Sequence, residues 1–281
     1  MTNSYGYNRK TPALDEQIMG AVKLHHEKVK AELKKLDIDY VVMTSLIGSQ
    51  NYDLDNENSD IDTFTFFFPK LYDFMSAAEP RYYEFDMPDG KCYVKDIRIA
   101  LNLLKKTSPN SVEYFVSKYK VYDNDFKKVL VHYLDNNSYI YPMIHCDYKH
   151  MLNAIAGMAH QLTKRNMPVG KCYAHELRLM EMRYHFIESI NAASVLELRP
   201  GGNVELLTHI KHDENQDNFP LYKQQSEEVA GWLRNYADSY ETQEKEKQLE
   251  ITGKLLIYSM QEDLFKHYIT LNAENLKETT N

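Results

Sequence analysis

The sequence lacks the features that mark disulfide-stabilised, zinc-binding and membrane-spanning proteins. Its three cysteines, Cys92, Cys146 and Cys172, are far apart and form no Cys-x-x-Cys pair, so neither a disulfide framework nor a zinc-finger pattern is readable. No apolar run approaches the roughly 18 residues that would suggest a membrane span, and the first residues lack the apolar core of a signal peptide. We therefore expect a cytoplasmic protein with no membrane partner.

An excess of basic residues is also lacking. The chain has 33 Lys and Arg against 41 Asp and Glu, which gives a formal net charge of −8 at pH 7. Proteins that bind long nucleic acids place clustered Lys and Arg side chains against many phosphates. The composition therefore argues against extended DNA binding, although an acidic protein can still contain a small basic cleft.

The hydrophobic patterning predicts a mixed α and β first part and a mostly helical second part. With 281 residues, 43% of them hydrophobic, the chain can bury a substantial core, and we expect two domains, residues 1–130 and 131–281. Apolar residues at helical or alternating spacing mark the elements of both parts. The predicted strands are 40–46, 61–69, 82–86 and 91–95, the last two joined by a hairpin turn at 87–90, and the predicted helices are 11–37, 97–104, 151–162, 173–195, 229–236 and 255–268.

The most specific feature is a Gly-Ser pair followed by an Asp-x-Asp sequence. Gly48-Ser49 ends one predicted strand, and Ser59-Asp60-Ile61-Asp62 enters the next. Glycine allows close approach of the backbone to a phosphate, and a serine hydroxyl with the amides of a following helix start can hold anionic oxygens. Asp60 and Asp62 lie two apart on a strand, so both point to one face. Their mutual repulsion favours a hard cation such as Mg²⁺ or Mn²⁺ between them.

In this arrangement the chain resembles the nucleotidyltransferase superfamily typified by the palm of DNA polymerase β, whose motif is a hydrophobic strand, Gly-Ser, a spacer and Asp-x-Asp. More narrowly, residues 48–54 and 59–62 are similar to the stand-alone predicted nucleotidyltransferases of bacteria and phages. Gln50, Asn51 and Asp53 depart from the Arg-Ala-Tyr-Gly that usually follows Gly-Ser in that family, while Tyr52 and Ser59 match it. Weaker similarities extend the resemblance over roughly residues 40 to 210. They are Val94–Arg98, Asn110, Val112, Glu113, Gly157–Ala159 and His175–Leu179.

The resemblance implies a small mixed β-sheet flanked by helices, with an appended helical domain that closes over a nucleotide. It also implies metal-dependent transfer of a nucleoside monophosphate from an NTP to a hydroxyl or phosphate acceptor, with release of pyrophosphate. Ser49 would hold the triphosphate, and Asp60 and Asp62 would bind the metal. The acceptor stays open between a protein, a small molecule and an RNA end. A bacterial or phage origin is implied too, which for a phage protein means the host cytoplasm. The alternative is a nucleotide-binding regulatory protein with impaired catalysis.

The superfamily usually adds a third carboxylate from a neighbouring strand, and two candidates are open. Asp96 follows the strand 91–95 and would complete the metal site or receive the acceptor proton, yet it equally suits the N-cap of the next helix. Asp86, on the preceding strand, is the substitute.

Four basic side chains are candidate phosphate partners. His175 and Arg178 stand three apart and share one helical face. Because their segment resembles the family's helical part, we expect them to bind the nucleotide; the alternative is an ordinary helix with polar neighbours. Arg98 is a further candidate, since its guanidinium offers a fork of donors that matches phosphate geometry, and Lys95 is an alternative.

Overall fold

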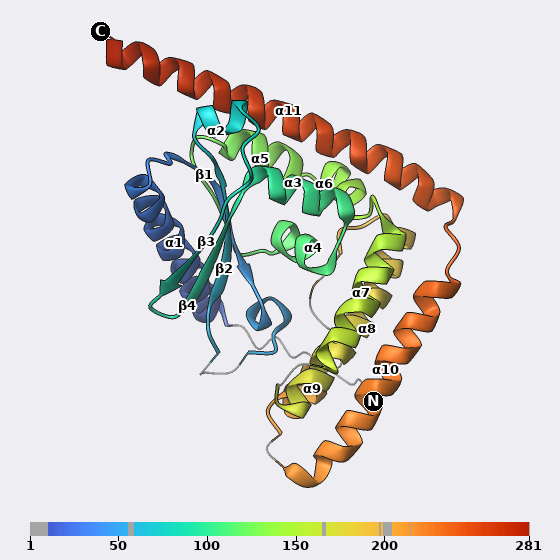
Figure 1. Ribbon diagram of the computed structural model, residues 1–281. Coiled ribbons are helices and arrows are strands. Elements are labelled where there is room, and N and C mark those ends of the chain that lie inside the picture. The colour runs from blue at the N-terminus through green and yellow to red at the C-terminus, as the bar shows by residue number, and fades with distance from the viewer. Residues whose placement is uncertain are drawn as a thin grey trace.

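A five-stranded mixed sheet forms the centre of the first half of the chain in the computed structural model (Figure 1). The structure describes residues 11–55, 59–164, 167–196, 198, 204–213 and 215–280. The strand order is β3-β4-β2-β1-β5; β2 and β4 are parallel, and all other pairs are antiparallel. The strands are β1 (Tyr40–Ile47), β2 (Asp62–Phe68), β3 (Tyr82–Met87), β4 (Gly90–Asp96) and β5 (Lys120–Tyr122). The four predicted strands are therefore present, and β5 is an addition.

Alternation of side chains along β2 decides what covers each face of the sheet. Phe64, Phe66 and Phe68 are buried in the main core with the helices that follow the sheet. Phe67 points the other way, into a smaller cluster with Val29 and Leu33 of α1 (Pro12–Lys35). Because every second residue changes face, one strand supplies apolar side chains to both layers.

Helix α1 also satisfies polar groups that the sheet buries beneath it. The imidazole Nδ1 of His25 lies 2.9 Å from the Thr63 hydroxyl, and Nδ1 of His26 lies 2.9 Å from the Thr44 hydroxyl. Thr11 caps the helix by accepting from the Leu14 N–H, and the proline at its first turn suits the start of a helix. Buried hydroxyls without such partners would destabilise the fold.

The remaining helices cover the opposite face of the sheet and continue into a mostly helical region (Figure 1). Helices α7, α8 and α10 pack on one another, and α9 packs on α8. The fold is thus α+β, as predicted. The helices are α2 (Leu71–Met75), α3 (Ile97–Lys106), α4 (Pro109–Val116), α5 (Lys127–Leu134), α6 (Asn137–Ile144), α7 (Tyr148–Leu162), α8 (Val169–Ala192), α9 (Val204–Lys211), α10 (Phe219–Ser239) and α11 (Glu244–Thr280), with the short 3₁₀ turns η1 (Ser49–Tyr52) and η2 (Gln216–Asn218).

The long helix α11 returns from the helical region to the first half of the chain. It packs against α6, α5 and α3. Near its far end the Tyr268 hydroxyl donates to the carbonyl of Pro69 over 2.6 Å, and the Tyr268 ring stacks on Phe68 with centroids 4.2 Å apart. The last helix therefore belongs to the core of residues 1–130 as much as to the predicted domain 131–281.

Within the described ranges, none of the helices combines the length and the apolar character that crossing a membrane requires.

Candidate functional site

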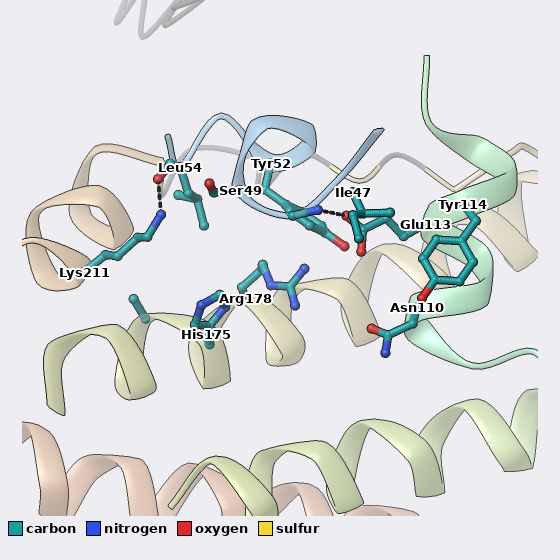
Figure 2. A pocket seen from close by; sticks show the side chains of 12 residues that line it. Ile47, Ser49, Tyr52, Leu54, Asn110, Glu113, Tyr114, His175, Arg178 and Lys211 are labelled. Atoms are coloured by element: carbon teal, nitrogen blue, oxygen red, sulfur yellow. Dashed lines mark hydrogen bonds between the residues drawn. The ribbon is translucent and has the colours of Figure 1, made fainter. Parts of the chain in front are cut away.

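A pocket of about 230 Å³ lies between the turn after β1 and the helices α4, α8 and α9 (Figure 2). Four of the predicted nucleotide-binding residues line it: Gly48, Ser49, His175 and Arg178. The full lining is Ile47, Gly48, Ser49, Tyr52, Leu54, Asn110, Glu113, Tyr114, Ala174, His175, Arg178 and Lys211. The fold thus gathers side chains from segments that are more than a hundred residues apart in the sequence.

Gly48 gives the turn its shape. Its φ of 88° lies in the region that L side chains rarely adopt, and an added Cβ would meet no atom within 4 Å. The position therefore needs glycine for its backbone conformation, and the space above it is open. The Gly48 N–H donates to the carboxylate of Glu113 over 2.6 Å, so this amide serves to hold the turn in place.

Glu113 connects the turn to helix α4 through hydrogen bonds. Its buried carboxylate also accepts from the side-chain amide of Asn51 over 3.1 Å. Asn51 in turn donates to the carbonyl of Leu46 and accepts from the Ser117 hydroxyl, both over 2.8 Å. Asn51, which departs from the resembled family's pattern, therefore holds the turn together. Burial raises the pKa of Glu113, an effect opposed by Arg178 and the hydrogen bonds.

Tyr52 orients Arg178 across the pocket. The Tyr52 ring is buried, and the guanidinium carbon of Arg178 lies 3.9 Å from its centroid, close enough for a cation–π interaction. Burial raises the pKa of the Tyr52 hydroxyl, so it stays neutral. Figure 2 places Arg178 and His175 on the side of α8 that faces the turn, as their spacing of three predicted.

Lys211 is a pocket residue that the sequence did not indicate. It ends α9, and its ammonium donates to the carbonyl of Leu54 over 2.6 Å (Figure 2). Burial lowers the pKa of Lys211 to about 8, with Lys171 and Arg178 adding to the effect and Asp55 opposing it. Only tertiary packing brings α9 to the turn after β1, so no local sequence signal could have identified this cation.

Asp62 does not line the pocket itself but lies beside a residue that does. It opens β2 opposite Ile47, which lines the pocket, and partners across an antiparallel pair share a face. Two residues further along that face, the Phe64 ring stacks on the pocket residue Tyr114 with centroids 4.1 Å apart. Asp60 is exposed and precedes β2, which begins at Asp62, so the prediction that one strand carries both carboxylates is wrong for Asp60.

The electrostatics of Asp62 suit a cation. Partial burial raises the pKa of Asp62, the Lys91 N–H that donates to it over 2.9 Å lowers it, and the charge of Asp60 raises it further. Mg²⁺ is usually held by one or two carboxylates together with substrate phosphates. The carboxylates of Asp62 and Asp60 are oxygen donors of the type that such an ion takes. Within the described ranges, no group of three His, Cys, Asp or Glu side chains forms a metal site.

Asp96 does not join this pair, and its prediction as the third carboxylate and metal ligand is wrong. It pairs with Phe67, at the far end of β2 from Asp62. Because β4 runs parallel to β2, the start of β4, and not its end, neighbours Asp62. Asp96 caps α3 by accepting from the Arg98 N–H over 2.9 Å, so the capping interpretation is correct.

Arg98 is likewise outside the pocket. Its guanidinium pairs with Asp96 over 2.7 Å and donates to the carbonyl of Ala78. Lys95 lies over the ring of Phe64, with 4.8 Å between its ammonium and the centroid, and does not line the pocket.

Lys91 and Tyr93 occupy the part of β4 that lies beside Asp62. Tyr93 pairs with Phe64, and Lys91 pairs with Asp86 on the edge strand β3. The Asp86 side chain is 91% exposed, and its carboxylate lies 4.0 Å from the Lys91 ammonium. Asp86 is thus at the same end of the sheet as Asp62, but strand β4, which carries Lys91, lies between them.

Comparison with protein-family models finds no match for the chain. Comparison with curated protein sequences finds no significant match either.

Proposed function

We propose that the chain is a metal-dependent nucleotidyltransferase, which moves a nucleoside monophosphate from an NTP to a hydroxyl or phosphate acceptor. One observation carries the proposal: the Gly48-Ser49 turn faces Arg178, His175 and Lys211 across one pocket, and Asp62 is the strand partner of the pocket residue Ile47. A polyphosphate needs cations and hydroxyl donors on one side and a metal-binding carboxylate where its α-phosphate reacts.

The pocket residues have distinct roles in this proposal. The Ser49 hydroxyl and the Lys211 ammonium hold the outer phosphates, and the fork of Arg178 holds two phosphate oxygens at once. The stacking of Arg178 on Tyr52 fixes its guanidinium before the nucleotide arrives, which lowers the ordering cost of binding.

The reaction is an in-line displacement at the α-phosphorus. A bond forms between the acceptor oxygen and that phosphorus, the bond to the bridging oxygen of the pyrophosphate breaks, and the pyrophosphate leaves with the electron pair. The acceptor's proton passes to solvent or to a base that the acceptor brings. When held by Asp60 and Asp62, Mg²⁺ or Mn²⁺ would offset charge on the phosphates and on the leaving pyrophosphate.

A second candidate is a nucleotide-binding regulatory protein with impaired catalysis. It is favoured by Lys91 and Tyr93, which take the positions on β4 beside Asp62. The resembled superfamily usually supplies a third carboxylate from a neighbouring strand, and this chain has a cation and a phenol there.

The test is calorimetry of NTP binding with and without Mg²⁺, followed by a pyrophosphate-release assay on the same samples. The variants are Asp60→Ala, Asp62→Ala and, as a matched control, Asp86→Asn, which removes a carboxylate at the same end of the sheet. Metal-dependent binding and pyrophosphate release that fail only in the first two variants support the transferase. Binding without release from any acceptor tested supports the regulatory protein. Folded protein that binds no NTP contradicts both.

A further inference from the structure

A second cavity of about 210 Å³ adjoins the pocket on the side of α7. The two cavities share Asn110, His175 and Arg178, which form the wall between them. We call the first cavity the turn chamber and the second the α7 chamber. The α7 chamber is completed by Met158, Gln161, Leu162, Met167 and Leu179.

The two chambers differ in chemistry. Besides the shared wall, the turn chamber has the Ser49 hydroxyl, the Lys211 ammonium and the Glu113 carboxylate, together with apolar side chains such as those of Ile47 and Leu54. The α7 chamber adds two thioethers and two leucines, and Gln161 is its one polar side chain outside the shared wall. Outside the shared wall, charged side chains line only the turn chamber, so a ligand that fills both chambers would place its charged end there.

Arg178 stands at the junction with part of its hydrogen-bonding capacity unused. Its Nε is buried and has no hydrogen-bond partner within the described ranges, although its guanidinium carbon stacks on Tyr52. Buried donors in native proteins nearly always have a partner. A ligand that passes from one chamber to the other would supply one.

The combined size of the two chambers admits a nucleotide. Ligand pockets for drug-sized molecules begin at roughly 300 Å³, a size that neither chamber reaches alone and that the two reach together. Methionine thioethers make favourable contacts with aromatic rings, and the side-chain amide of Gln161 offers both a donor and an acceptor to the edge of a base.

The acceptor does not suit the α7 chamber. It must reach the α-phosphate beside Asp62, and the pocket residues nearest Asp62 are its strand partner Ile47 and Tyr114, which stacks on Phe64. Both line the turn chamber, and neither lines the α7 chamber.

We propose that the α7 chamber binds the nucleobase of the NTP, with Met158 and Leu179 against the ring and Gln161 reading its edge. This inference rests on the proposed function only in placing the phosphates in the turn chamber. It adds that base recognition comes from α7 and α8, far in sequence from the Gly-Ser and Asp-x-Asp segments.

The test compares inorganic tripolyphosphate with ATP, GTP, CTP and UTP, each titrated calorimetrically with Mg²⁺ into the full chain. At least one NTP should bind about tenfold more tightly than tripolyphosphate, as expected from stacking of a base. Met158→Trp, which fills the chamber, should remove that advantage and leave tripolyphosphate binding unchanged. Gln161→Met should narrow the spread of affinities among the four NTPs.

Two controls separate the possible failures. Lys211→Ala should weaken tripolyphosphate and NTPs by the same factor, and unchanged tripolyphosphate binding shows that Met158→Trp is folded. Equal binding of tripolyphosphate and every NTP to the natural chain would overturn the inference while leaving phosphate binding in place. So would a Met158→Trp variant that binds NTP normally but no longer transfers to an acceptor, which would assign the chamber to the acceptor. Absence of binding by either ligand would instead contradict the proposed function.

Discussion

The backbone N–H of Gly48 donates to the carboxylate of Glu113 over 2.6 Å, so a glutamate from α4 holds the turn that carries Ser49. The same carboxylate accepts from Asn51 and faces Arg178 across the pocket. One buried side chain thus connects the two walls between which we place the triphosphate.

Glu113→Ala should lower both stability and nucleotide affinity. It leaves the Gly48 N–H and the Asn51 amide without their acceptor, which costs about 1–3 kcal/mol of unfolding free energy. Glu113→Gln keeps an oxygen acceptor and should retain most of that stability. Urea denaturation and NTP titration of both variants measure the effect. If Glu113→Ala and Glu113→Gln lost the same amount of unfolding free energy, the role of Glu113 as a hydrogen-bond acceptor would be contradicted. Its negative charge would then be the important property.

Phosphate binding should weaken as pH rises through about 8. The pKa of Lys211 is lowered to about 8, so above that pH the side chain loses the proton that makes it a cation and a phosphate partner. Lys211→Arg stays charged throughout and should bind tripolyphosphate with little pH dependence between pH 7 and 9. Lys211→Met should bind weakly at every pH. If tripolyphosphate binding by the natural chain and by Lys211→Arg changed with pH in the same way, a group other than Lys211 would be responsible for the pH dependence.

Asp62→Asn should remove stabilisation by Mg²⁺ without destabilising the metal-free protein. The pKa of Asp62 is raised by burial and by Asp60, so the folded state holds its proton to higher pH than the unfolded chain does. The folded state therefore loses stability as pH rises from the pKa of Asp62 in the unfolded chain to its raised pKa in the folded protein. An uncharged asparagine avoids this loss. Thermal unfolding with Mg²⁺ measures the stabilisation by the metal, and thermal unfolding with EDTA measures the stability of the metal-free protein. Asp86→Asn is the control and should keep the Mg²⁺ response.

Asp96→Ala should destabilise the fold and leave nucleotide affinity unchanged. It removes the cap of α3 and the partner of Arg98, a loss of about 1–3 kcal/mol for the hydrogen bonds left unmade. Denaturation and NTP titration under conditions where the variant is folded separate the two effects. If the Asp96→Ala variant had normal stability but no longer bound NTP, Asp96 would again be a candidate residue of the nucleotide site.

Local pattern was enough to predict the four main strands, the long first helix and the hairpin at Pro88. The family resemblance, and not local pattern, placed Ser49, His175 and Arg178 in one site, and all three line one pocket. Residue spacing could not reveal that β2 and β4 pair in parallel, and that pairing decides which end of β4 lies beside Asp62. The Asp96 prediction failed for this reason.

Other parts of the site depend on contacts between distant segments. Lys211 reaches the pocket because α9 packs on α8, and Glu113 acts on Gly48 from 65 residues away. Neither contact leaves a periodic signal in the sequence. The strand β5 has only three residues, too few for alternation to be recognised.

The Tyr268 hydroxyl that donates to Pro69 lies 199 residues further along the chain. Phe68, on which Tyr268 stacks, is therefore synthesised long before its cover. At about 5–20 residues per second, the interval on the ribosome is on the order of ten to forty seconds. During that time the side of Phe68 that Tyr268 will cover is open to chaperones and to other nascent chains. Slow synthesis or premature termination before residue 268 would therefore favour aggregation of this protein.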